Sequence, residues 1–220
     1  MERQKKSEFS DGLMRHLFHV HTCYTDGKLS ASDWFEIASK VGVRRITFLE
    51  HTRRAPSYDI NDLKNEVCIL SKRFGIEGTV GVEARILPDG VLDISEETLM
   101  TIDVLGIAEH SFPFNNELYY EAWTAVLKNY RTVFSRVQTV WVHPGLYWKK
   151  HDLLDTEKHR YELQIHEAIE AGLLIEKNIR YDLLPDNLIH LVPKAKLIVG
   201  LDGHRREDIV LWLSHARMQY

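Results

Sequence analysis

Cysteine is scarce in this sequence of 220 residues, which contains only Cys23 and Cys68. Their contexts suggest neither a disulfide framework nor a CxxC site, so we expect a reducing compartment and a cytoplasmic location. The sequence also lacks a run of the ~20 apolar residues that a membrane span needs, so we expect no membrane partner. Residues 1–8 are charged and no apolar run follows them, so we expect no secretory signal.

An excess of positive charge is also absent, because the formal net charge is −4. A nucleic-acid partner is therefore disfavoured without being excluded. No internal repeat, low-complexity segment or mid-chain linker interrupts the sequence, and its 44% of hydrophobic residues can fill one substantial core. We expect a solvated lead-in at residues 1–12 and a single domain at residues 13–220.

The sequence does contain seven short apolar segments that alternate with helical patterns. Such alternation predicts βαβ units and a mainly parallel sheet, and seven steps favour a closed or nearly closed barrel over a doubly wound sheet. The expected strands lie near 17–22, 45–51, 78–86, 102–108, 139–142, 173–178 and 197–204. The Pro88-Asp89-Gly90 turn predicts a hairpin from the third strand into residues 91–94, which a plain barrel would not need.

Residues that can bind metals stand at or just past the ends of these strands. His19 and His21 share one face of the first strand because they lie two residues apart, although such a pair alone is a weak metal signal. In an α/β barrel the carboxyl ends of all strands meet at one mouth. The candidate ligands that would meet there are His19, His21, Asp26, His51, Glu83, His110, His143, Asp202 and His204.

Six imidazoles and three carboxylates exceed the needs of one tetrahedral zinc ion and would serve two or three divalent ions. Three dications would keep a net positive charge beside three carboxylates, so the mouth would attract a small anionic, phosphorylated substrate. The ions would also lower the pKa of bound water. Every other histidine is expected at the surface or in a capping role: His16, His151, His159, His166, His190 and His215.

Arginines follow several of the candidate ligands directly. Their guanidinium groups suit bidentate phosphate binding, although rim or helix-start charges are an equally good interpretation of each. The candidates are Arg53, Arg54, Arg85, Arg205 and Arg206. Tyr147 and Trp148 would either line the pocket or pack in the core, and Asn178 is a candidate for a bond to a ligand residue or to substrate.

These residues resemble the motifs of the polymerase and histidinol phosphatase (PHP) superfamily of metal-dependent phosphoesterases. The resemblance covers about residues 16–210 and keeps the order and spacing of the motifs. It is carried by His19-Val20-His21-Thr22-Cys23-Tyr24-Thr25-Asp26-Gly27, Glu50-His51, Gly81-Val82-Glu83, His110, His143-Pro144-Gly145 and Asp202-Gly203-His204. Two positions depart from the family pattern, Leu17 and Leu49-Glu50, and we expect them to tune the metals rather than abolish binding.

The resemblance implies an α/β fold, a distorted (β/α)7 TIM-like barrel of the PHP type, with two or three divalent ions (Zn, Mn or Fe). It implies that Glu83 bridges two ions, that a metal-bound hydroxide attacks phosphorus, and that His110 or His143 helps to protonate the leaving group. Asp202 completes the expected catalytic set.

The expected substrate is a small phosphomonoester, histidinol phosphate-like or nucleotide-like. Three alternatives stay open: a phosphodiesterase or 3′-end nuclease, hydrolysis of a non-phosphate bond such as an amide, and a non-catalytic binding module that metals stabilise. The sequence gives no indication of the oligomeric state.

Overall fold

Seven parallel strands form a closed barrel in a computed structural model of the chain, which describes residues 15–52, 54 and 56–218. The strands pair in sequence order, and the last one closes the barrel by pairing with the first. They are β1 (His16–Val20), β2 (Arg45–His51), β3 (Glu77–Arg85), β4 (Val104–Ala108), β5 (Gln138–Trp141), β6 (Leu174–Asn178) and β7 (Leu197–Gly203). The predicted (β/α)7 TIM-like barrel is thereby confirmed; the predicted lead-in at 1–12 lies outside the described residues.

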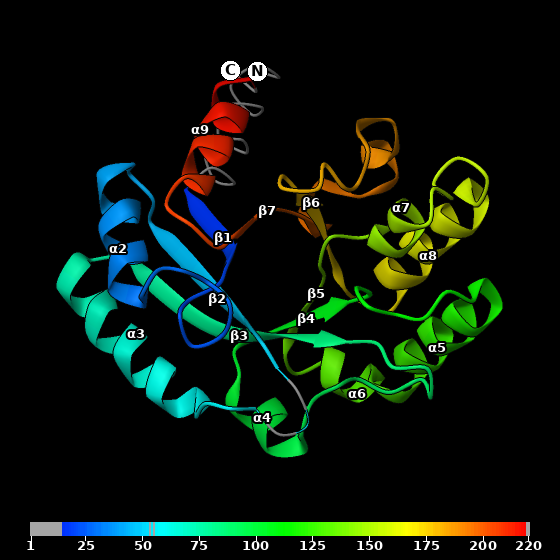
Figure 1. Cartoon of the computed structure of the whole chain (residues 1–220), viewed down its shortest axis with the longest axis horizontal. Coiled ribbons are helices and arrows are strands. Elements are labelled where there is room, and N and C mark those ends of the chain that lie inside the picture. The colour runs from blue at the N-terminus through cyan, green and yellow to red at the C-terminus, as the bar shows by residue number, and fades with distance from the viewer. Residues whose placement is uncertain (1–14, 53, 55, 219–220) are drawn as a thin grey trace.

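Helices surround the barrel, with α2 and α3 on one side and α5 and α8 on the other (Figure 1). They are α2 (Ala31–Lys40), α3 (Ile60–Phe74), α4 (Glu96–Thr101), α5 (Asn116–Asn129), α6 (Arg131–Phe134), α7 (Leu146–Lys150), α8 (Lys158–Glu170) and α9 (Asp208–Met218), with short 3-10 turns η1 (Asp186–Leu191) and η2 (Lys194–Lys196). Among the described residues, no helix is long and apolar enough to cross a membrane.

Local sequence explains where several elements begin and end. Ser30 and Asp33 form a reciprocal capping box at the start of α2, and Gly75 ends α3 in a left-handed conformation. The expected hairpin after β3 forms as a short antiparallel ladder: Ile86 pairs with Leu92, the Leu87 N–H donates to the Val91 oxygen, and the Asp93 N–H donates to the Arg85 oxygen. The expected long helix over 116–135 divides at Tyr130, which caps α5 and precedes α6.

The barrel interior is layered along the strand direction. A central apolar layer contains Phe18, Leu49 and Val140, which belong to one buried cluster. Below it, at the amino end, His16 contacts Thr47, and above it, at the carboxyl end, lie His19 and further polar side chains. Inward side chains of alternate strands fill α/β barrels in this way, and the polar layer at the carboxyl end is where active sites form.

Candidate metal centre

All nine candidate ligands meet at the carboxyl mouth of the barrel. Their ligand atoms form four overlapping groups in which the atoms of each group lie within 4.8 Å of one another. The groups are His21, Asp26, His51 and His204; His19, His21 and Asp202; His19, Glu83 and His143; and His51, Glu83 and His110. The sequence prediction that these residues converge is therefore confirmed, and metal binding by each of them stays a prediction.

The buried carboxylate of Glu83 is the centre of the cluster, because both of its oxygens face imidazole nitrogens. Oε2 lies 3.4 Å from His19 Nε2, 3.5 Å from His21 Nε2 and 3.4 Å from His51 Nδ1. Oε1 lies 2.7 Å from His110 Nε2 and 2.8 Å from His143 Nε2. One carboxylate that serves two sets of nitrogens has the arrangement of a bridging ligand.

The spacing of the ligand atoms fits divalent ions. Two atoms that each lie about 2.1 Å from a tetrahedral ion are about 3.4 Å apart, which is longer than a hydrogen bond. The same spacing recurs around Asp202 Oδ1, 3.4 Å from His21 Nε2 and 3.4 Å from His204 Nδ1. It recurs around Asp26 Oδ2, 3.4 Å from His51 Nε2 and 3.3 Å from His204 Nε2.

A second observation supports the fit. His21 is completely buried, and neither of its ring nitrogens forms a hydrogen bond within the described part of the chain; the same holds for the buried Nδ1 of His143. Buried polar groups in native proteins are almost always satisfied. A divalent ion would provide the missing partner of His21, so the residues present fit the group that the sequence implies.

Electrostatics in the cluster follow burial and the mixture of charges. Burial alone would raise the pKa of Glu83, but the imidazoles of His143 and His110 hold that pKa well below its usual value. Burial lowers the pKa of His21 to about 4, so its ring is neutral and free to donate a lone pair. For His19, burial is outweighed by the carboxylates of Glu176 and Asp202, which raise its pKa.

Three candidate ligands occupy the left-handed region of backbone space. Their φ angles are +65° at His19, +32° at His143 and +55° at Asp202. His19 also sits where the pairing register of β1 shifts between Phe18 and Val20. Such backbone costs about 1–3 kcal/mol per residue and concentrates at functional sites. Here it turns side chains at strand ends into the mouth of the barrel.

Glu176 supports the cluster from below, and the sequence analysis missed it. Its Oε1 lies 2.7 Å from His19 Nδ1, and its Oε2 accepts hydrogen bonds from the backbone N–H of His143 and from Asn178 Nδ2. A Cβ atom on Gly200 would lie 1.7 Å from Glu176 Oε1, so only glycine leaves room for this carboxylate. Asn178 thus donates a hydrogen bond to a residue that contacts the candidate ligand His19, which is one of the two roles that its position suggested.

Glu50 has a comparable role on the other side. Its carboxylate accepts the backbone N–H of Thr22 at 2.8 Å and the hydroxyl of Thr25, which fixes the loop that carries Asp26. Burial raises the pKa of Glu50 to about 7. The departure from the family pattern at this position therefore falls on a residue that orients the ligand loop.

The cluster opens into a cavity of about 470 Å³ whose wall carries several cations. Besides the ligands, the lining comprises Lys28, Ser111, Lys150, Arg180, Tyr181 and Arg205. Arg180 donates to the backbone oxygen of Asp202 and to His204 Nδ1, each at 2.9 Å. Arg205 was predicted from the sequence; Lys28, Lys150, Arg180 and Tyr181 were not, because each depends on how a loop returns over the mouth.

Comparison with known proteins agrees with this architecture. The chain is 24% identical over 212 residues to the DNA polymerase/3′-5′ exonuclease PolX of Bacillus subtilis, a match that covers 89% of the chain and 35% of the relative. The chain thus spans about a third of that curated relative. The “putative histidinol phosphatase” HisK of Listeria monocytogenes has a similar fold, with a TM-score of 0.61, 14% identity, and coverage of 88% of this chain and 97% of HisK. No family model matches.

These findings agree with the resemblance to the PHP superfamily that the sequence shows. The resemblance seen in the sequence is confirmed, and the two matched proteins carry the two names, polymerase and histidinol phosphatase, from which the superfamily name derives. At 14% identity the structural likeness establishes the fold alone.

The other predicted substrate-binding arginines occupy different places around the barrel. Arg206 does not line the cavity, and its charge helps to lower the pKa of Asp33 after the Ser30 hydrogen bonds. Arg85 pairs with Asp93 at 2.5 Å and lines an adjoining hollow of about 560 Å³. Arg54 is exposed and lies 3.6 Å from Asp89. Arg53 lies outside the described residues.

Three further predictions can be compared with the structure. Tyr147 and Trp148 are buried packing residues, and the Tyr147 hydroxyl bonds Asn115 and Asn116. His16 is not a surface or capping residue: it is half-buried at the amino end of the barrel, with Nε2 2.8 Å from Thr47 Oγ1. The sequence could not reveal this, because the partner lies 31 residues away.

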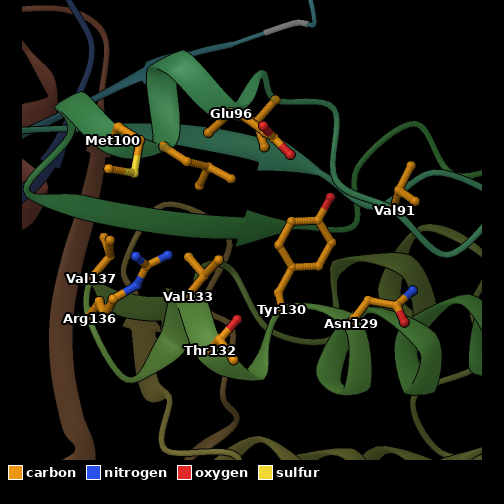
Figure 2. Close-up of a pocket in the computed structure, with 11 residues that line it drawn as sticks. Val91, Glu96, Met100, Asn129, Tyr130, Thr132, Val133, Arg136 and Val137 are labelled. Carbon is orange, nitrogen blue, oxygen red and sulfur yellow. The ribbon is translucent and has the colours of Figure 1, made fainter.

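A larger cavity, of about 730 Å³, lies away from the ligands. Figure 2 shows Glu96 and Met100 of α4 on one wall and Tyr130, Val133 and Arg136 of the opposite segment on the other. Its lining contains a single carboxylate and no histidine. Among the described residues, the groups of side chains that could hold a metal ion lie at the carboxyl mouth of the barrel.

Proposed function

We propose that this chain is a metal-dependent phosphoesterase that hydrolyses small phosphomonoesters, histidinol phosphate-like or nucleotide-like. The observation that carries the proposal is the Glu83 carboxylate, which faces five imidazole nitrogens with both oxygens and lies on the wall of a cavity that also contains four cations. Clustered divalent ions beside guanidinium groups are the combination that phosphate chemistry requires.

The nine residues of the cluster would hold two or three ions of Zn, Mn or Fe. Bound there, such ions lower the pKa of water and polarise a phosphoryl oxygen. The chain itself contributes position and charge. Arg180 lies against Asp202 and His204, where its guanidinium can contact an oxygen of the phosphoryl group, and Arg205 offers a second guanidinium from the wall.

His110 and His143 are the alternative donors of a proton to the leaving oxygen. The side chain of His110 is 19% exposed, whereas that of His143 is 2% exposed and its backbone N–H is bonded to Glu176. His110 is therefore the better placed of the two to reach a leaving group that enters from the cavity.

The proposal is tested with purified protein reconstituted with Mn²⁺ or Zn²⁺. We expect at least two bound ions per chain by elemental analysis, and faster hydrolysis of p-nitrophenyl phosphate than of bis-p-nitrophenyl phosphate. Fewer than two ions per chain, or the absence of turnover with either metal and either ester, would contradict it.

A second candidate is a phosphodiesterase or 3′-end nuclease, because one relative is named a 3′-5′ exonuclease. The net charge of −4 and the limited extent of the cationic wall weigh against a long nucleic-acid substrate. Faster hydrolysis of the diester than of the monoester in the same assay would favour this candidate.

A further inference from the structure

The cavity wall carries more positive charge than one phosphoryl group needs. Three divalent ions would outweigh the three carboxylates of the cluster and leave enough charge to neutralise a phosphomonoester dianion. Four cations of the wall stand beside this centre: Lys28, Lys150, Arg180 and Arg205. Arg180 is partly neutralised, because its Nη1 lies 3.6 Å from Asp208 Oδ2.

The other three cations are not paired in this way with any described residue. The side chains of Lys28, Lys150 and Arg205 are exposed and form no ion pair within the described part of the chain. Each comes from a different segment: the loop after β1, the end of α7 and the loop after β7. Elsewhere, cations near carboxylates do pair, as Arg85 does with Asp93 at 2.5 Å.

This local concentration of charge contrasts with the chain as a whole, whose net charge is −4. Like charges gathered on one wall raise the local potential and destabilise the free protein unless an anion occupies the space between them. A cavity of about 470 Å³ also falls in the size range of small-molecule sites and exceeds what a lone phosphate fills.

We propose that the substrate carries a second anionic group, a carboxylate or a further phosphate, which Lys28, Lys150 and Arg205 bind while its phosphoryl group lies at the metal centre. This inference rests on the proposed function and names the class of its substrate. A small compound with two anionic groups fits better than a nucleic-acid strand, because the adjoining hollow is lined by a single arginine, already paired with Asp93, rather than by a continuing basic track.

The test uses two non-hydrolysable ligands that differ by one carboxylate, propylphosphonate and 3-phosphonopropionate. Their dissociation constants are measured by calorimetry on the full chain loaded with Mn²⁺. We expect 3-phosphonopropionate to bind about 10-fold or more tightly at low salt, because an added ion pair near a protein surface has this strength. The ratio of the two dissociation constants, which we call the preference, should decrease as NaCl is raised toward ~0.5 M, since salt screens exposed charges.

Matched variants then separate the cations from the metals as the source of the preference. Lys28→Ala and Lys150→Ala should each reduce the preference several-fold while the affinity for propylphosphonate changes little. Arg205→Ala should reduce the preference and also weaken both ligands, because this guanidinium can reach the phosphoryl group as well. Lys150→Arg should retain it, and Lys40→Ala, at the far end of α2, should leave both affinities unchanged. A preference that is absent, or that survives all three alanine variants, would overturn the inference alone.

Two further outcomes keep the alternatives apart. If neither phosphonate binds and neither ester is hydrolysed, the proposed function fails together with the inference. A second outcome is that a single-stranded tetranucleotide displaces propylphosphonate at a lower concentration than 3-phosphonopropionate or a nucleoside bisphosphate does. The second anion would then belong to a nucleic-acid strand, and the small-molecule assignment would be wrong.

Discussion

The two ends of the barrel interior each contain a histidine on or just after strand β1, and the two histidines differ in their hydrogen bonding. At the amino end, His16 Nε2 lies 2.8 Å from Thr47 Oγ1, which in turn lies 2.6 Å from Thr79 Oγ1. At the carboxyl end, both ring nitrogens of His21 are buried and form no hydrogen bond with the residues that the structure describes. An apolar layer that includes Phe18 separates the two groups.

The direction of the pKa shift does not distinguish these histidines. Burial lowers the pKa of His16 to about 3 and that of His21 to about 4, so both rings are neutral near pH 7. The difference lies in hydrogen bonding, because the His16 ring has found a protein partner and the His21 ring has not. Buried polar groups normally form hydrogen bonds, so a buried group without a partner is expected to contact a ligand. The comparison therefore places the ligand site at the carboxyl end.

The largest effect should come from the carboxylate that the two sets of imidazoles share. We expect Glu83→Gln to lower turnover of p-nitrophenyl phosphate by about 10³-fold or more, because the variant removes the charge that holds the ions together. Bound metal should fall in parallel by elemental analysis.

Glu77→Gln is the matched control, since Glu77 begins the same strand at the amino end and pairs on the surface with Arg45. It should retain metal and activity. Full metal content and activity in Glu83→Gln would remove the basis for treating the carboxyl end as a metal centre.

The second effect is on stability and should also be confined to one end. Ions that bind only the folded chain at about 100 times their Kd stabilise it by about 2.7 kcal/mol. Chelation should therefore lower the Tm by about 5–11 °C for a chain of this size. His16→Gln should start from a lower Tm and show the same chelation shift, measured by differential scanning calorimetry. A Tm that does not change on chelation would contradict the inference that the carboxyl end binds metal ions.

The sequence predicted the metal centre better than it predicted the surroundings of that centre. The convergence of all nine candidate ligands was predicted because each lies near or past the carboxyl end of a recognisable strand, and a barrel of parallel strands brings such positions together. Glu176 was missed because an acidic residue inside a strand gives no sign of which face it occupies until the register of β6 is known.

The wall of the cavity was predicted least well, for a related reason. Arg205 and Arg206 are adjacent in sequence, yet one lines the cavity and the charge of the other acts on Asp33. Arg180 reaches the mouth only because Asn178 Oδ1 accepts the backbone N–H of Tyr181 and turns the chain back. Loop direction depends on such tertiary hydrogen bonds, which no local sequence pattern encodes.

The smallest expected effect tests the amino end through pH. Because the pKa of His16 is lowered to about 3 in the folded chain, folding favours its neutral ring. The stability that this ring contributes is complete above its unfolded pKa near 6.5 and is lost as the pH falls toward 3. The free energy of unfolding should therefore fall faster with acid in the wild type than in His16→Gln, by no more than about 1.4 kcal/mol per pH unit.

Urea unfolding of metal-free protein at pH 7 and pH 5 measures this difference, and the chelator prevents ligand protonation from contributing through metal release. Protonation of the mouth histidines is common to both proteins and cancels in the difference, because the apolar layer separates the two ends. An equal pH dependence in the two proteins would mean that burial, together with the charge of Arg45, does not hold His16 neutral in the folded chain.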